Sequence, residues 1–322
     1  MQFLELFKKK KGGELIKQYH NGHVLAYALL ATGLLGVDKK SLEIMRLAVS
    51  NKMLKRLRKQ YSRFICNFVN ANKNHESVCE KEAVSNGKIW ICWFQGIENA
   101  PSVVKKCVDS IRKSMPEREV VLITDENWNK YVQFPPYILE KVRNGVISKT
   151  HFSDLLRLEL LIKYGGTWMD TTIFCTSKCP SYMMEADLFL FQNLKPGLDG
   201  QATRISNWFI TAKKENCILK LTRDLLYEYW KKQNSLIDYY IFHDMFELAI
   251  EAYPDEWQKV PPVSNSTSHI LLLRLFDKYD EELWGVIKGQ TSIHKLTYKF
   301  SKEQEMITGT YYDTLFKQEQ LW

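Results

Sequence analysis

The sequence predicts an α/β domain with a parallel sheet, preceded by a helical N-terminal segment. Continuous apolar runs at 88–94 and 119–124 are typical of strands that are buried on both faces. A helical pattern at 101–114 separates them, and the order strand–helix–strand favours parallel pairing. Apolar residues make up 45% of the 322 and aromatic residues 13%, which is enough for a core and argues against disorder.

The chain divides into two predicted parts. A polar stretch without periodicity at 70–87 is typical of a linker, so residues 1–85 form an N-terminal region and residues 86–322 form the α/β domain. In the first part, the apolar run 23–37 is shorter than the roughly 20 residues that a membrane-spanning helix needs. It is expected to be a buried or interfacial helix. Residues 41–69 alternate apolar and basic positions at helical spacing.

The basic charge of the chain lies in its N-terminal quarter. Residues 1–75 hold 15 Lys and Arg against 4 Asp and Glu, whereas the remainder holds 30 against 33. A basic amphipathic helix is typical of anionic membrane surfaces. The alternative is a helical hairpin that packs on the main domain through Leu54, Leu57, Tyr61 and Phe64. Nucleic acid is not an expected partner, because no recognised fold accompanies the charge.

A helix, a glycine pair and a strand follow one another between residues 148 and 176. Ser148 or Thr150 can cap the helix, and Gly165-Gly166 stands where a helix ends in a left-handed cap. A strand at 167–169 follows at once, with Asp170 at its end. Because ligands bind outside the carboxyl ends of strands in open α/β sheets, Asp170 is a candidate site residue.

Asp154 and Arg157 are three residues apart in the predicted helix and share one face, outside its leucine stripe. Alone, such a pair is usually a weak surface ion pair. Together with the glycine pair and the terminal carboxylate, the stretch S-D-L-L-R…K-Y-G-G-T-W-M-D resembles the core of nucleotide-sugar glycosyltransferases of the GT-A fold. It is most similar to capsular polysaccharide synthesis transferases related to family 32, and more distantly to the large clostridial glucosylating toxins.

The resemblance implies a donor and metal site. Asp154 and Arg157 would touch the donor sugar and diphosphate. An Asp-x-Asp motif would hold the nucleotide sugar and a divalent metal, Mn²⁺ or Mg²⁺. Asp170 matches its first residue, but Thr172 stands at the second, and a hydroxyl is a weaker ligand than a carboxylate. In the stretch S-I-H-K-L-T-Y-K at 292–299, the resemblance implies a basic tail over the diphosphate. Its candidates are His294 as a third metal ligand and Lys295 and Lys299 as donor-binding residues.

Three further residues are implicated. Trp93 ends the first predicted strand, and the resemblance implies that it stacks on uracil, although such an aromatic is more often a core residue. Asn207 opens a segment that the resemblance places between donor and acceptor, so it is a catalytic candidate with Asp170. Asp244 lies on a helix expected to begin near Ile237 and is a candidate to face the acceptor. The neighbouring Tyr239 and Tyr240 are expected in the core.

The resulting expectation is a retaining glycosyltransferase that moves a hexose or N-acetylhexosamine from a UDP-sugar to a lipid-linked or growing glycan. It would serve bacterial capsule or surface polysaccharide synthesis. Its location would be peripheral, at the cytoplasmic face of the membrane, because seven scattered cysteines without a secretory signal fit a reducing compartment. The alternative is a non-catalytic membrane-bound scaffold that has lost the second Asp.

Overall fold

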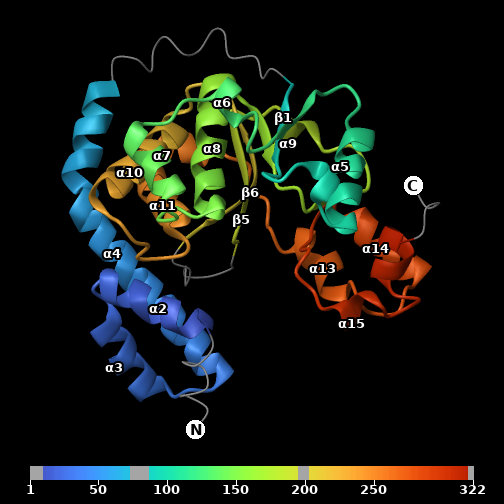
Figure 1. Ribbon diagram of the computed structural model, residues 1–322, viewed down its shortest axis with the longest axis horizontal. Helices are drawn as coiled ribbons and strands as arrows, with labels where there is room; N and C mark the ends of the chain where they lie inside the picture. The colour runs from blue at the N-terminus through green and yellow to red at the C-terminus, as the bar shows by residue number, and fades with distance from the viewer. Residues whose placement is uncertain (1–9, 73–86, 195–202, 318–322) are drawn as a thin grey trace.

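Figure 1 shows a computed structural model of the chain, which describes residues 10–72, 87–194 and 203–317. Within these residues, a mixed five-stranded sheet has the order β2–β1–β3–β6–β5. Strand β1 pairs in parallel with β2 and β3, whereas β6 runs antiparallel to β3 and β5. The parallel sheet is thus confirmed for three strands, and two more extend it. The strands are β1 (Ile89–Cys92), β2 (Val120–Ile123), β3 (Gly166–Met169), β5 (Leu188–Gln192) and β6 (Ile205–Ala212).

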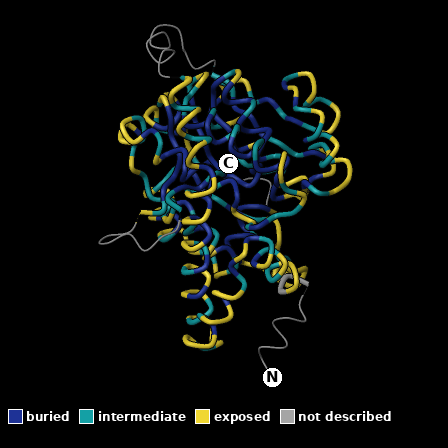
Figure 2. The backbone as a smooth tube through the Cα atoms, turned by 90° about the vertical axis from the view of Figure 1, so that its left-hand side faces the viewer, coloured by how far each residue is buried: buried dark blue, intermediate teal, exposed yellow. Residues whose placement is uncertain are grey.

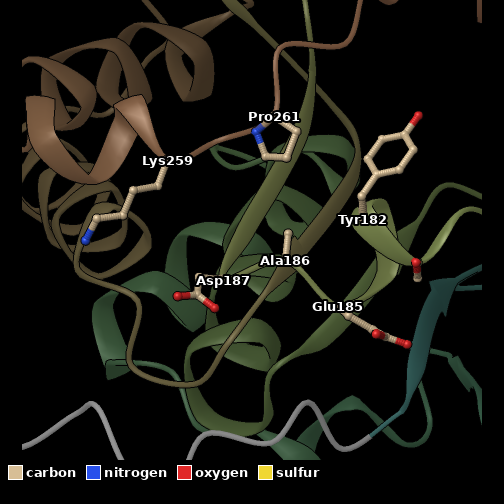
Figure 3. A pocket seen from close by; sticks show the side chains of 7 residues that line it. Tyr182, Glu185, Ala186, Asp187, Lys259 and Pro261 are labelled. Carbon is tan, nitrogen blue, oxygen red and sulfur yellow. The ribbon is translucent and has the colours of Figure 1, made fainter.

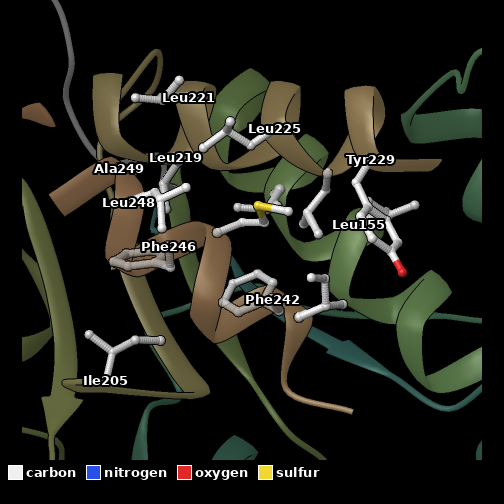
Figure 4. Packing of buried hydrophobic residues seen from close by; sticks show 14 of the residues in the cluster. Leu155, Ile205, Leu219, Leu221, Leu225, Tyr229, Phe242, Phe246, Leu248 and Ala249 are labelled. Carbon is white, nitrogen blue, oxygen red and sulfur yellow. The ribbon is translucent and has the colours of Figure 1, made fainter. Parts of the chain in front are cut away.

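Three helices cover one face of this sheet: α8 (Lys149–Tyr164), α10 (Cys217–Lys232) and α11 (Ile241–Ala252). Figure 4 shows apolar side chains of these helices in one cluster, among them Leu155 from α8, Leu225 from α10 and Phe242 from α11. The sheet contributes Trp90 and Trp168 to the same cluster. This face is the larger part of the core and fixes α8 over the carboxyl edge of the sheet.

Helix α5 (Ser102–Ser114) covers the opposite face. Successive residues of a strand point to opposite faces, so Ile89 and Ile91 pack with Ile111 on the α5 side while Trp90 packs on the other side. The continuous apolar run at 88–94 therefore reflects a strand buried on both faces, as the sequence predicts.

A second, two-stranded sheet brings residues 293–295 back to the carboxyl edge of the main sheet. Strand β4 (Ile173–Cys175) pairs antiparallel with β7 (Ile293–Lys295), and Ile173 lies opposite Lys295. Helices α13 (Ile270–Arg274) and α14 (Glu281–Gln290) pack near it. The shorter helices are α6 (Trp128–Tyr131), α7 (Pro136–Arg143), α9 (Ser181–Met184), α12 (Pro254–Gln258), α15 (Lys302–Glu305) and the turns Ile97–Asn99, Thr267–His269 and Asp313–Lys317.

The N-terminal region is helical: α2 (Lys10–Asn21), α3 (Leu25–Leu35) and α4 (Lys39–Asn72). Helix α4 runs along the domain beside α10 and α11 (Figure 1) and buries Leu54, Leu57 and Tyr61 in the main core cluster. Arg58 also holds Glu251 of α11 at 2.6 Å. The structure therefore has the packed hairpin that the sequence left as an alternative. Most of the predicted linker lies outside the described residues.

The hairpin of α3 and α4 extends beyond the sheet (Figure 1), and Figure 2 colours much of its backbone as exposed. Leu29, Leu30 and Leu34 are 53%, 64% and 79% exposed. Ile44 and Leu47 at the start of α4 are exposed as well. Among the described residues, no helix is both long enough and apolar enough to cross a bilayer.

Candidate active site

Helix α8 delivers its side chains to the carboxyl edge of the sheet because both of its ends are fixed. Ser148, one of the two predicted caps, accepts a hydrogen bond from the backbone N–H of His151 at 3.3 Å, whereas Thr150 lies within the helix. Gly165 ends the helix with φ of 66°, in the left-handed region that favours glycine. A Cβ at Gly165 would lie only 3.1 Å from the carbonyl oxygen of Ala212. Glycine therefore also allows the close approach of the β6 backbone at the point where α8 ends and β3 begins.

The carboxyl ends of β1 and β3 and the beginning of β6 meet at one edge. Met169 at the end of β3 lies opposite Phe209, and the backbone N–H of Asp170 donates to the carbonyl of Trp208 at 2.9 Å. Trp93 directly follows β1. This pairing brings Trp93, Asp170 and Asn207 to the same edge of the sheet.

Arg157 joins the two acidic candidates. Its Nη2 lies 3.2 Å from Asp154 Oδ1 and 3.9 Å from Asp170 Oδ1, and its Nη1 donates to the backbone carbonyl of Asn207. The Asn207 amide also donates to Asp154 Oδ1 at 3.0 Å. The Arg157 side chain is only 5% exposed and that of Asp154 11%. The pair is therefore buried and part of a network, unlike the surface ion pair that its spacing alone suggests.

Two aromatic rings hold the guanidinium of Arg157. Its Cζ lies 4.8 Å from the ring centroid of Trp168 and 5.6 Å from that of Phe242. The indole N–H of Trp168 donates to Asp170 Oδ1 at 3.1 Å. Sequence reasoning did not assign these two aromatics to the site. The T-W-M-D pattern held the only signal for Trp168, and Phe242 depends on long-range packing.

Lys295 completes the cluster from the end of the chain. Its Nζ lies 2.9 Å from Asp170 Oδ2 and 2.5 Å from Thr172 Oγ1. Pairing of Ile173 with Lys295 and the hydrogen bond from Leu296 N–H to Thr172 O, 2.9 Å long, fix this position. Two cations and an indole N–H therefore surround Asp170, whose side chain stays 29% exposed.

The two carboxyls respond to these surroundings in opposite directions. Burial by itself raises the pKa of Asp170, but Lys295 and Arg157 outweigh it, so the pKa of Asp170 falls below its ordinary value. Burial raises the pKa of Asp154, and Arg157 offsets this only in part. Asp170 is therefore an anion at neutral pH and lies between two cations.

His294 does not join this cluster, contrary to its expected role as a metal ligand. It is fully buried on the other side of β7 from Lys295, opposite Phe174 and 5.7 Å from the ring centroid of Trp284. Its Nε2 is 3.4 Å from Thr176 Oγ1, and burial lowers its pKa to about 4. Neighbouring residues of a strand face opposite sides, so His294 and Lys295 cannot both reach Asp170.

The expected metal set does not fit this arrangement. Mn²⁺ and Mg²⁺ prefer several oxygen ligands, but the structure offers one carboxylate and one hydroxyl, Asp170 and Thr172, and Lys295 already lies between them. No group of three or more His, Cys, Asp or Glu side chains in the described ranges could hold a metal ion.

The aromatic candidate Trp93 lies at the rim of the cluster. It is partly buried and meets the ring of Tyr298 edge to face, with centroids 5.2 Å apart. Its indole N–H has no hydrogen-bond partner among the described residues. Lys299 lies in the same tail with its Nζ 5.7 Å from the ring centroid of Tyr298. The tail therefore places the ring of Tyr298 beside Trp93, with the Lys299 ammonium near that ring.

Asp244 lies in the core rather than at the cluster, so its predicted contact with an acceptor is wrong for this conformation. It is 2% exposed, and one of its carboxyl oxygens has no partner in the described part of the chain. Burial, then Asp238 and Glu247, raises its pKa well above the ordinary value, and Arg58 of α4 opposes the shift. These neighbours show that Asp244 faces the α4 side of α11.

Tyr239 and Tyr240, expected in the core, are instead 51% and 58% exposed. Their rings meet edge to face at 5.2 Å. His151 of α8 bonds to the Tyr239 carbonyl at 3.1 Å. Burial, then the neighbouring Tyr240, and then Asp154, Asp170 and Tyr298 raise the pKa of Tyr239. An exposed aromatic pair thus borders the site.

A pocket elsewhere does not compete with this cluster. Figure 3 shows it lined by Tyr182, Glu185, Asp187 and Lys259. Asp187 precedes β5, and β5 begins opposite the end of β6 that pairs with Gly166. The pocket therefore lies at the edge of the sheet opposite Asp170, and its acidic lining does not suit an anionic ligand.

Comparison with known proteins assigns a family. Residues 37–315 match the family described as "Capsular polysaccharide synthesis protein", so the chain belongs to that family. This confirms the resemblance seen in the sequence.

Two curated relatives are O-glycosyltransferases. BraB of Annulohypoxylon truncatum is 25% identical over 197 residues, 55% of this chain and 46% of that protein. PaGT of Phomopsis amygdali is 26% identical over 173 residues, 48% of this chain and 41% of that protein. The chain spans about half the length of these relatives. Both come from fungi, so they do not support the expected bacterial origin.

Among solved structures, PaToxG Glycosyltransferase has a TM-score of 0.39 at 14% identity, covering 67% of this chain and 85% of its own. At that TM-score the likeness does not define the fold.

Proposed function

We propose that this protein is a retaining glycosyltransferase of GT-A type that uses a nucleotide sugar, with UDP as the nucleotide. The observation that carries the proposal is the pair of cations, Arg157 and Lys295, that meet at Asp170 outside the carboxyl ends of parallel strands. The family assignment and the names of the two relatives support the same class of reaction.

In this proposal the diphosphate of the donor lies against Lys295 and Arg157. A planar guanidinium can hold two oxygens at once, and an ammonium has three donors, of which Asp170 and Thr172 engage two. Trp93 supplies a ring for the base, since stacking on aromatic side chains is the usual sequence-tolerant contact to a base. Lys299 adds a further cation from the same tail.

The reaction then needs charge stabilisation more than covalent chemistry. As the bond between the sugar and the β-phosphate breaks, negative charge develops on the leaving nucleoside diphosphate, and fixed cations in a buried site stabilise it. Asp154 and Asn207, joined at 3.0 Å, border the place for the donor sugar. Among the residues that the structure describes, no side chain is positioned as an evident covalent nucleophile. We therefore propose substitution on one face, with the leaving phosphate accepting the proton of the acceptor hydroxyl.

The acceptor side of the proposal rests on Tyr239 and Tyr240. Their exposed rings beside the cluster offer flat, amphipathic surfaces that suit a sugar ring or glycan. We propose a lipid-linked or growing glycan acceptor in surface polysaccharide synthesis.

The test is a panel of UDP- and GDP-sugars assayed for release of the nucleoside diphosphate. One donor should be turned over by the wild-type protein, and Asp170→Asn should reduce turnover at least about 100-fold. Asp170→Asn must show the wild-type circular dichroism and melting behaviour. Turnover equal to wild type in this variant would defeat the proposal.

A non-catalytic scaffold is the second candidate, and Thr172 at the second acidic position favours it. Such a protein would bind a nucleotide sugar or glycan without releasing a nucleoside diphosphate from any member of the panel. The same assay therefore separates the two functions.

We also propose that the hairpin tip of α3 and α4 attaches the protein to an anionic membrane at its cytoplasmic face. Leu30 and Leu34 are exposed at the tip, and the exposed basic residues Lys39, Lys40 and Arg46 flank them. Apolar side chains that enter the interface beside cations that meet anionic headgroups are the usual combination for such attachment. The packed face of α4 takes no part, because Leu54 and Leu57 are buried in the core.

A further inference from the structure

Lys295 lies where a motif of two carboxylates would place a divalent cation. Its Nζ is 2.9 Å from Asp170 and 2.5 Å from Thr172, the two residues at the first and second positions of the Asp-x-Asp pattern. The side chain is only 17% exposed. The pairing of β4 with β7 sets its position, since Lys295 lies opposite Ile173, the residue after Thr172. The ammonium is thus part of the folded framework.

The charges at this position are the same with Lys295 as with a metal. Two carboxylates and a divalent cation sum to zero, and so do Asp170, a neutral Thr172 and a protonated Lys295. Replacing the second Asp by Thr removes one negative charge. Replacing a divalent metal ion by the ammonium of Lys295 removes one positive charge, so the sum stays the same. A carboxylate at position 172 would instead leave a net negative charge next to the diphosphate.

The remaining geometry agrees with this substitution. The third expected ligand, His294, is buried on the far side of β7 and bonds to Thr176. Arg157 approaches the other oxygen of Asp170 at 3.9 Å. Lys295 keeps one N–H donor beyond Asp170 and Thr172, and neither its side chain nor that of Asp170 is fully buried.

We propose that Lys295 replaces the divalent cation, so that this protein binds the donor diphosphate and transfers the sugar without a metal. The inference rests on the proposed function, because its ligand is a nucleoside diphosphate. In the transfer, the bond from the anomeric carbon to the β-phosphate oxygen breaks and a bond to the acceptor oxygen forms. The acceptor proton passes to the leaving phosphate. Lys295 stays protonated and neutralises part of the charge that develops on this phosphate.

The experiment is calorimetric titration of the full chain with UDP and GDP, in EDTA and in Mn²⁺. At least one nucleotide should bind in EDTA with a Kd within about twofold of its value in Mn²⁺. Lys295→Met, which keeps the aliphatic stem, should weaken binding at least about tenfold in both buffers, because a hydrogen bond to a charged group is lost. Lys295→Arg should restore most of it. The control Lys302→Met changes an exposed lysine of α15 and should bind as the wild type does.

Electron paramagnetic resonance adds a readout without nucleotide. The wild-type protein should leave the signal of free Mn²⁺ unchanged. Binding of UDP or GDP only in Mn²⁺, or a tight Mn²⁺ site in the wild type, would overturn the inference and leave the proposed function standing. Wild-type affinity in Lys295→Met would overturn the inference and would also remove Lys295 from the proposed diphosphate site. If no nucleotide binds in either buffer, the proposed function fails and the inference fails with it.

Discussion

At the scale of residues, Arg157 is the centre of the site because one guanidinium joins the two acidic candidates and the backbone of Asn207. It reaches Asp154, Asp170 and the carbonyl of Asn207, and Trp168 and Phe242 hold its guanidinium. No single-point cation can make these contacts together. The spacing of Asp154 and Arg157 predicts that they touch, whereas their burial depends on how α8 packs against α11 and the sheet.

We therefore predict that Arg157→Lys lowers kcat/KM for the nucleotide sugar at least about tenfold, because the fork geometry is lost while the charge remains. Steady-state kinetics measure this. Arg112→Lys is the matched control, since Arg112 forms an i,i+3 pair with Asp109 at 3.5 Å on the surface of α5 and should be neutral. If the two variants behave alike, Arg157 has no special role.

Asp244 leads to a different prediction, about stability. Its pKa is raised in the folded protein, chiefly by burial and then by Asp238 and Glu247. A carboxyl whose pKa is higher in the folded than in the unfolded protein adds to the free energy of unfolding at a pH below its ordinary pKa of about 3.9. This stabilisation is lost as the pH rises through the higher pKa of the folded state. Asp244→Asn should therefore raise Tm relative to wild type at pH 8, with a smaller difference near pH 4.

The same variant should retain turnover, because Asp244 faces the α4 side of α11 and not the cluster. Thermal melts across pH and one activity assay suffice. A loss of activity in a folded Asp244→Asn, or a pH dependence of Tm equal to that of wild type, would show that this assignment is mistaken.

At the scale of elements, α4 shows why an amphipathic pattern alone is ambiguous. Burial against α10 and α11 and adsorption to a membrane require the same alternation of leucine and basic residues. The structure buries Leu54, Leu57 and Tyr61, so removal of residues 1–85 would expose apolar surface on α10 and α11. The exposed leucines of α3 are the part of this region that we propose to contact a membrane.

We predict that Leu30→Asp with Leu34→Asp abolishes co-sedimentation with anionic liposomes while leaving hydrolysis of the donor unchanged. Each leucine that enters an interface contributes about 1.5–3 kcal/mol, and the new carboxylates repel anionic headgroups. Leu273→Asp is the control, because Leu273 is 78% exposed but lies on α13. Retained co-sedimentation of the double variant at low salt would rule out the hairpin tip as the membrane contact.

Strand β7 shows a second limit of sequence reasoning. The sequence pointed to His294, Lys295 and Lys299 together, since all belong to one basic stretch. Alternation along β7 places only one of His294 and Lys295 at Asp170, and which one depends on its register with β4. A register between strands more than a hundred residues apart in the chain cannot be derived from local pattern.

At the scale of the whole molecule, the parallel strands of the sheet could be predicted from the sequence. The residues that distant segments add to the site could not. The apolar runs of β1, β2 and β3 and the glycine pair before β3 carry strong local signals, and they place Asp170 and Trp93 at one edge. The contributions of β6, β7 and α11 depend on chain segments far away in sequence. For this reason the sequence located Asp154, Arg157 and Asp170 together but misplaced His294, Asp244 and the tyrosine pair.

We propose above all that the cluster of Arg157, Asp170 and Lys295 holds the diphosphate of a nucleotide sugar. A crystal structure of the wild-type protein with the nucleoside diphosphate of its best donor tests this most directly. We expect phosphate oxygens within hydrogen-bonding distance of Lys295 Nζ and Arg157, with the base against Trp93. A diphosphate bound at another place, with Lys295 still joined to Asp170 and Thr172 and no phosphate beside it, would show that this cluster is not the donor site.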